Sequence, residues 1–232
     1  MKLGIMQPYF FSYIGYWQLM NAVDKYVIYD DVNFIKGGWI NRNRILMNGE
    51  AKMINLQMFG ASPNKLINAV EVSGNSVYSK KLLRTIESCY KKAPYFSKAF
   101  PVIENIVTQS EKNLARYLEY SIKQICEYLS METELIVSST INKDNDLRGQ
   151  AKVIQICKIL GANEYYNAIG GQKLYSYDDF ARQGIKLRFL KTKTIEYRQY
   201  NNEFISNLSI IDIMMFNSIE AIRKTLGQYE LL

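Results

Sequence analysis

The sequence contains no histidine among its 232 residues. A chain without histidine has no Ser–His or Cys–His nucleophile pair, no imidazole ligand for zinc, and none of the side chain that most often moves protons near neutral pH. Any catalysis must therefore use carboxylates, lysine or tyrosine, or act through positioning and electrostatics.

Cysteine is scarce, and the spacing of Cys89, Cys126 and Cys157 matches no metal-binding or disulfide pattern. Each cysteine lies in an apolar, helix-like stretch, so we expect buried thiols. The sequence thus predicts no His/Cys metal site and leaves the cofactor unknown, with ATP and Mg²⁺ or an acyl donor both open.

Long apolar runs are also missing. None approaches the roughly 18 residues that a membrane-spanning helix needs, and the N-terminal run Leu3-Gly-Ile-Met6 is too short for a signal peptide. We therefore expect a cytoplasmic protein with no transmembrane segment. Apolar residues at 48% and charged residues at 22% are typical of a globular protein.

The charge balance is basic, with 29 Lys and Arg against 22 Asp and Glu, a net charge of +7. This excess suits anionic partners such as nucleotides, although solubility alone is an equal explanation. The basic residues are spread along the chain, whereas a nucleic-acid binder needs a contiguous basic face. We expect a small anionic ligand and no nucleic acid, and a homo-oligomer stays open.

Hydrophobic periodicity predicts an α/β fold. Strands are expected at residues 2–6 and 25–30 around a helix at 13–23, which is a βαβ opening. Later strands are expected at 52–57, 69–72, 134–137, 164–168 and 185–190, with helices at 150–160, 177–183, 209–216 and 219–226. We predict one domain over residues 1–232 with a mostly parallel sheet, a helical insertion at about 77–130 and C-terminal helices.

Polar loops after these strands are the candidate binding segments, because ligands of α/β proteins usually lie there. The first loop offers the amide of Gln7 and the rings and hydroxyls of Tyr9, Tyr13 and Tyr16, although the aromatic residues could instead form a core wall. Asp30 and Asp31 end the second strand, where one carboxylate could take a proton from a substrate amine or bind Mg²⁺. Alternatively, one of them could cap a helix or a turn.

Further donors follow the second and later strands. Arginine forks match phosphate geometry, and paired glycines leave room for an anion, although alternating arginines could also line an exposed strand. The donor-rich segment contributes Asn33, Lys36, Trp39, Asn41, Arg42, Asn43 and Arg44, and it lacks the P-loop order. Two later loops contribute Ser138, Ser139 and Arg148, and then Asn167, Gly170 and Gly171, whose glycines could serve only a turn.

Several of these motifs resemble the WbqC-like family of bacterial proteins. The N-terminal ones are Gln7-Pro-Tyr-Phe-Phe-x-Tyr-Ile-Gly-Tyr16 and Asp24-Lys-Tyr-Val-Ile-Tyr-Asp-Asp-Val-Asn-Phe-Ile-Lys-x-Gly-Trp-Ile-Asn-Arg-Asn-Arg-Ile-Leu46. The later ones are Tyr166-Asn-Ala-Ile-Gly-Gly171, Gly184-Ile-Lys-Leu-Arg-Phe-Leu190 and Leu208-Ser-Ile-Ile-Asp-Ile-Met-Met-Phe-Asn217. One departure is Ser12, where the family pattern has proline, so we expect a less rigid loop.

The resemblance implies a role in surface polysaccharide (O-antigen) biosynthesis. The leading hypothesis is a transferase that adds an acyl or aminoacyl group to the amine of a nucleotide-linked amino sugar. Asp30 or Asp31 would orient or deprotonate the amine, Arg42, Arg44 and Arg148 would hold the diphosphate, and Tyr9 or Tyr16 would contact a ring. Its partners would be the nucleotide-linked sugar and the acyl or aminoacyl donor.

Two alternatives remain. The layout of residues 7–16 is similar to the first loop of nucleotidyl-transfer enzymes such as pantothenate synthetase, a Rossmann-type fold, which suggests an ATP-dependent ligase that forms an adenylate. The paired histidines of those enzymes are missing here. A binding or scaffold protein of a glycan assembly pathway, without chemistry, is the other alternative.

Overall fold

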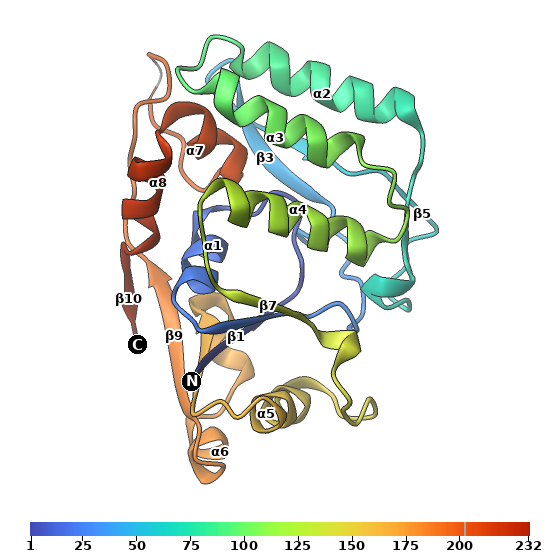
Figure 1. Ribbon diagram of the computed structural model, residues 1–232, viewed down its shortest axis with the longest axis vertical. Helices are drawn as coiled ribbons and strands as arrows, with labels where there is room; N and C mark the ends of the chain where they lie inside the picture. Colours follow the sequence, from blue (N-terminus) through green and yellow to red (C-terminus); the bar gives the residue numbers. More distant parts are fainter. Residues whose placement is uncertain (202) are drawn as a thin grey trace.

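The computed structural model describes residues 1–201 and 203–232 and is built on a six-stranded sheet in the order β10-β9-β8-β1-β2-β7 (Figure 1). The strands are β1 (Lys2–Met6), β2 (Lys25–Ile28), β7 (Glu134–Val137), β8 (Glu164–Ala168), β9 (Lys186–Thr192) and β10 (Tyr229–Leu231). All neighbouring pairs are parallel except β9 and β10. The prediction of an α/β fold with a mostly parallel sheet is confirmed.

Alternating side chains bury both faces of this sheet. Leu3, Ile5 and Val27 enter one hydrophobic core, whereas Tyr26 and Ile28 enter the other. Helices α5 (Gly149–Ile159) and α6 (Tyr177–Arg182) contribute to the first core, and α1 (Ile14–Asn21), α7 (Ile210–Phe216) and α8 (Ile219–Leu226) contribute to the second. A parallel sheet covered on both faces is the usual arrangement for such apolar strands.

The segment between β2 and β7 enlarges the second core. It holds the hairpin β3 (Arg42–Met47) and β4 (Glu50–Asn55), the short pair β5 (Met58–Phe59) and β6 (Glu71–Val72), and helices α2 (Ser76–Tyr90), α3 (Phe96–Thr108) and α4 (Leu114–Tyr128). Figure 1 shows the three helices side by side above the sheet. The strand predicted at 69–72 is shorter, because the 3₁₀-helix η1 (Ile67–Ala69) takes its first residue.

None of the helices in the described ranges, 1–201 and 203–232, has both the length and the apolar character needed to cross a membrane.

The order of the strands reverses beside β1. The chain runs outward from β1 through β2 to β7, and then returns to β8 on the other side of β1 and continues to β9. The loop after β1 leads to α1 on one face of the sheet, whereas the loop after β8 leads through η3 (Ile169–Leu174) to α6 on the other face, so the two loops diverge. In open α/β sheets, this switch point is where ligands bind.

Candidate functional site at the carboxyl edge of the sheet

The predicted polar loops meet at one edge of the sheet. Gln7 directly follows β1, Asp30 and Asp31 follow β2, Ser138 follows β7, and Asn167 lies near the end of β8. Because these four strands are neighbours and parallel, their carboxyl ends lie side by side. The loops are therefore close in space, although more than one hundred residues separate the second from the third.

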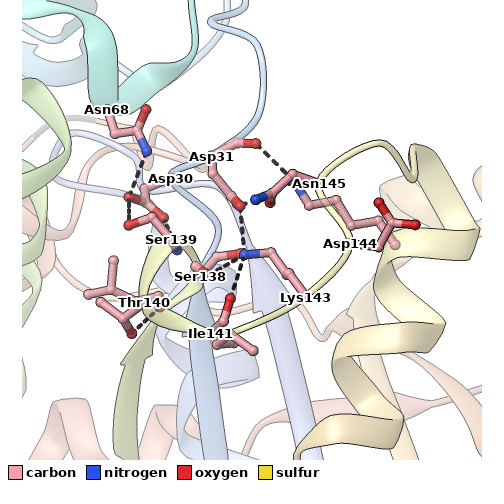
Figure 2. A network of polar contacts seen from close by, with 12 residues as sticks. Asp30, Asp31, Asn68, Ser138, Ser139, Thr140, Ile141, Lys143, Asp144 and Asn145 are labelled. Carbon is pink, nitrogen blue, oxygen red and sulfur yellow. Dashed lines mark hydrogen bonds and ion pairs between the residues drawn. The ribbon is translucent and has the colours of Figure 1, made fainter.

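A buried ion cluster lies at this edge, formed by Asp31, Lys143 and Lys152 and called here the Asp31 cluster. Figure 2 shows the pair of Asp31 and Lys143. The Asp31 Oδ2 atom lies 2.7 Å from Lys143 Nζ and 3.1 Å from Lys152 Nζ. Lys143 also donates to the carbonyl of Ser138, and Lys152 donates to the carbonyl of Asp31 at 3.2 Å. The side chains of the two lysines are only 1% and 4% exposed, so solvent screens these pairs weakly.

Charge and burial shift the pKa of the Asp31 carboxyl in opposite directions. Burial raises the pKa of its carboxyl, but hydrogen bonds from Lys143, Ser138 and Lys152 together lower it further, and the net pKa lies below the usual value. Asp31 is therefore ionised at neutral pH. Two ammonium groups share one carboxylate, so the Asp31 cluster carries one positive charge in excess and favours an anion nearby.

Three buried oxygen atoms of this edge, Asp31 Oδ1, Asp31 Oδ2 and Ser138 Oγ, make no hydrogen bond of ordinary geometry within the described chain. Oδ2 nevertheless forms the ion pairs with both lysines, and the Ser138 hydroxyl is close enough to Asp31 to lower its pKa. The Asp31 carboxylate therefore has capacity for a further donor, such as an amine or a hydroxyl.

The neighbouring carboxylate has a structural role instead. Asp30 Oδ1 accepts a hydrogen bond from the Ser139 amide at 2.9 Å, and Oδ2 accepts from Ser139 Oγ at 2.7 Å and Asn68 Nδ2 at 3.3 Å. Figure 2 shows Asp30 turned toward Ser139 and Asn68, while Asp31 turns toward Lys143. Asp30 thus ties β2 to the start of η2 (Ser138–Thr140).

Several tyrosines lie near this edge of the sheet. Lys152 Nζ lies 5.6 Å from the ring centre of Tyr29. Burial, then the charge of Asp31 and Tyr175, raise the pKa of Tyr29, and burial, then Tyr13 and Tyr175, raise the pKa of Tyr9. Burial also raises the pKa of Tyr13 and Tyr175. Tyr29, Tyr175, Tyr9 and Tyr13 therefore keep their hydroxyl protons at neutral pH, and the group is called here the tyrosine row.

Tyr9 and Tyr13 also line a cavity of about 320 Å³, called here the aromatic pocket. Its lining residues in the described chain are Tyr9, Ser12, Tyr13, Trp39, Asn43, Arg44 and Asn207. Five of them were predicted from sequence as ligand-binding: Tyr9 and Tyr13 from the loop after β1, Trp39 from the loop after β2, and Asn43 and Arg44 from β3.

The family model of the WbqC-like protein family matches residues 7–224, which include the Asp31 cluster, the tyrosine row and the aromatic pocket. The chain belongs to the WbqC-like family. It is also 26% identical over 229 residues to the uncharacterized protein Rv1507c of Mycobacterium tuberculosis (strain ATCC 25618 / H37Rv), with 95% of each chain covered. No solved structure matches.

Other predicted residues of this WbqC-like chain hold the site in shape. Asn43 Nδ2 donates to the carbonyls of Phe10 and Phe11 at 3.1 and 2.8 Å, which fixes the first loop. Asn41 donates to Leu56, and Tyr16 is buried in the core against Tyr26. These contacts position the aromatic pocket, which Asn43 also lines.

The remaining predicted residues are exposed, bonded within their own segments, or without a contact that the structure describes. Asn33, Lys36 and Ser139 are exposed, and the guanidinium groups of Arg42 and Arg148 donate to carbonyls of their own loops. Asn167 is buried and donates to Tyr165 at 2.6 Å, and Gly171 lets the chain pass close to it. Gly170 has open space around it, and the half-buried Gln7 side chain makes no hydrogen bond within the described ranges.

Four residues near the site were not predicted from the sequence: the two lysines of the Asp31 cluster, and Tyr29 and Tyr175 of the tyrosine row. Lys152 sits in α5 beside Val153, one turn before Ile156, so it falls on the stripe that faces the core. A lysine on an apolar stripe is the signal that could have identified it, since lysine is rarely buried without a partner. Nothing local distinguishes Lys143 within its polar loop.

A second buried carboxylate was also missed. Asp212 accepts hydrogen bonds from Tyr90 and Tyr197 at 2.7 Å each and from Gln199 at 2.6 Å. No ion pair involves it in the described residues, and burial raises its pKa against the effect of these donors. The network joins α7, α2 and the segment after β9 behind the aromatic pocket. No group of three or more His, Cys, Asp or Glu residues in the described chain could hold a metal ion.

Gly15 supports the aromatic pocket by leaving room for Tyr13. A Cβ atom at Gly15 would lie 2.5 Å from the Tyr13 hydroxyl and 2.6 Å from Thr192 Oγ1. We expect Gly15→Ala to displace Tyr13 and to cost about 1–3 kcal/mol of stability, the usual range for overpacking. Urea unfolding would measure this, with Gly170→Ala as the matched control because open space surrounds Gly170. Equal stability of the two variants would contradict the prediction.

Proposed function

We propose that this chain is a transferase that adds an acyl or aminoacyl group to the amine of a nucleotide-linked amino sugar in surface polysaccharide biosynthesis. The observation that carries the proposal is the Asp31 carboxylate, which lies buried at the carboxyl edge of the sheet and is held ionised by two buried lysines. The family resemblance supplies the polysaccharide context.

Asp31 suits the handling of an amine. An amine N–H would donate to Asp31 Oδ1, which orients the nitrogen lone pair toward the acyl carbon. As the new C–N bond forms and the bond to the leaving group breaks, the nitrogen loses a proton, and an ionised carboxylate can accept it. A neutral amine is a strong nucleophile already, so the reaction needs no histidine.

The lysines suit the negative charge of the reaction. The excess positive charge of the Asp31 cluster would stabilise the oxyanion that develops on the acyl group or a phosphate of the substrate. Arg148 lies near enough to Tyr29 to lower its pKa, so its charge also reaches this end of the site.

The test is a product assay on the purified protein with nucleotide-linked amino sugars. Each is incubated with acyl-CoA, or with ATP, Mg²⁺ and a carboxylic or amino acid, and the products are identified by mass spectrometry. An N-acylated sugar made from acyl-CoA supports the transferase. Product that requires ATP and releases pyrophosphate would replace it with the adenylate-forming ligase. Thermal stabilisation by a nucleotide sugar without any product would favour the binding protein.

A further inference from the structure

The aromatic pocket differs from the rest of the site in its charge. Among the described residues that line it, none is acidic and Arg44 alone is charged. The ion pairs of the described chain do not include Arg44. The pocket therefore offers a cation that has no carboxylate to neutralise it.

Arg44 has hydrogen-bonding capacity to spare. Its Nε atom is buried and has no acceptor in the described part of the chain, while Nη2 donates to the carbonyl of Asn207 at 3.3 Å. An orphaned guanidinium N–H inside a cavity is costly unless a ligand accepts from it. A phosphate or carboxylate would do so with the fork geometry that arginine favours.

Arg44 is also held in place. It lies on β3, where its carbonyl accepts from the Ser209 amide at 2.8 Å and its own amide donates to Asn43 Oδ1 at 2.8 Å. The carbon of its guanidinium lies 5.6 Å from the ring centre of Trp39. A pre-positioned cation loses little conformational entropy when an anion binds.

Aromatic rings surround this cation. The Trp39 side chain is 42% exposed, although it is one of the two tryptophans of the chain and large rings are usually buried. Tyr9 and Tyr13 line the same cavity. Exposed rings beside an arginine are the arrangement on which nucleobases stack, because every base presents a flat π face.

We propose that the aromatic pocket binds a nucleoside diphosphate, with its base stacked on Trp39 and its phosphates held by Arg44. This rests on the proposed function in one respect, since it places the nucleotide part of the sugar substrate in the aromatic pocket. The sugar would then extend from this pocket toward Asp31, which follows β2, the strand beside β1. Arg44 is the phosphate ligand of the three predicted arginines, because Arg42 and Arg148 donate to their own loops.

Tryptophan fluorescence tests the proposal without any transfer chemistry. The chain has only Trp17, which is fully buried, and the exposed Trp39, so quenching by a ligand reports on Trp39. UDP and GDP are the probes, as a pyrimidine and a purine diphosphate. We expect saturable quenching by at least one of them, and Trp39→Phe should abolish the signal and weaken binding measured by calorimetry.

Arg44→Gln is the second variant. It keeps a polar side chain but removes the charge, and we expect about 10- to 100-fold weaker binding of the diphosphate, the range for hydrogen bonds to a charged group. Arg84→Gln, an exposed arginine on α2, is the matched control and should bind as the wild type does. Uridine and inorganic pyrophosphate should each bind more weakly than UDP, because each satisfies only one part of the pocket.

The outcomes separate this proposal from the proposed function. No binding of UDP or GDP, or pyrophosphate binding as tightly as UDP, would overturn the nucleotide pocket. Binding of UDP without any product in the transfer assay would leave the pocket standing and count against the transferase. Product formation that Arg44→Gln leaves unchanged at low substrate concentration would overturn the pocket and leave the transferase intact.

Discussion

Replacing Asp31 with asparagine is expected to lower turnover by about 10²- to 10⁴-fold, the usual contribution of a positioned acid or base. Asparagine keeps the size of the side chain but cannot take a proton from the attacking amine. It also removes the charge that holds Lys143 and Lys152 in place. The measurement is the turnover number of the purified variant with the substrate pair found in the product assay.

Two further variants keep this prediction interpretable. Asp31→Glu retains the charge between the lysines but moves the carboxylate by one methylene, so it should fold well and still lose most of the activity. Lys25→Ala removes an exposed ion pair between β2 and β7, 3.1 Å from Glu134, and should leave turnover unchanged. A folded Asp31→Asn protein with wild-type turnover would refute the role of Asp31.

The strands of the sheet were predictable because their signal is local. The predicted strands 2–6, 134–137 and 164–168 match β1, β7 and β8 residue for residue, since each contains adjacent β-branched, aromatic or other apolar residues. The helix 219–226 matches α8 for a similar reason, with Ser218 accepting from the Ala221 amide at its start.

The hairpin of β3 and β4 was not predicted from the sequence. The sequence analysis treated the alternation of Arg42, Asn43 and Arg44 mainly as a donor-rich loop, whereas these residues begin a strand. The signal for a hairpin was present at Asn48 and Gly49, which both adopt positive φ. Because the arginines lie on a strand, their side chains point to one face, and only Arg44 reaches the aromatic pocket.

The different partners of Asp30 and Asp31 could not be predicted from the sequence. The two residues are adjacent, and their roles depend on partners from distant segments, Ser139 and Asn68 for one and Lys143 and Lys152 for the other. The α/β rule did predict that the loops would meet at the carboxyl edge. It could not predict which side chains would have hydrogen-bond or ion-pair partners within the chain.

Replacing Lys152 with methionine is expected to destabilise the fold by about 3 kcal/mol, the lower end of the range for breaking a buried pair. Lys143 still compensates the Asp31 charge in this variant, which keeps the loss small. Asp31→Asn should cost more, about 5 kcal/mol, because it leaves two buried ammonium groups without a carboxylate. Urea unfolding of both variants at neutral pH measures which one loses more unfolding free energy, with Lys25→Ala as the exposed control.

The pH dependence distinguishes an ion cluster from simple packing. The folded pKa of Asp31 lies below its unfolded value of about 3.9, so its contribution to stability is present above that pH and is lost as the pH falls through the folded pKa. In Lys152→Met one lowering charge is gone, so this loss should begin at a higher pH than in the wild type. The stability gap between the two proteins should then shrink in acid, because protonated Asp31 pairs with neither lysine. A gap that stays constant across this range would mean that Lys152 contributes by packing its methylene groups, and the Asp31 cluster would lose its electrostatic role.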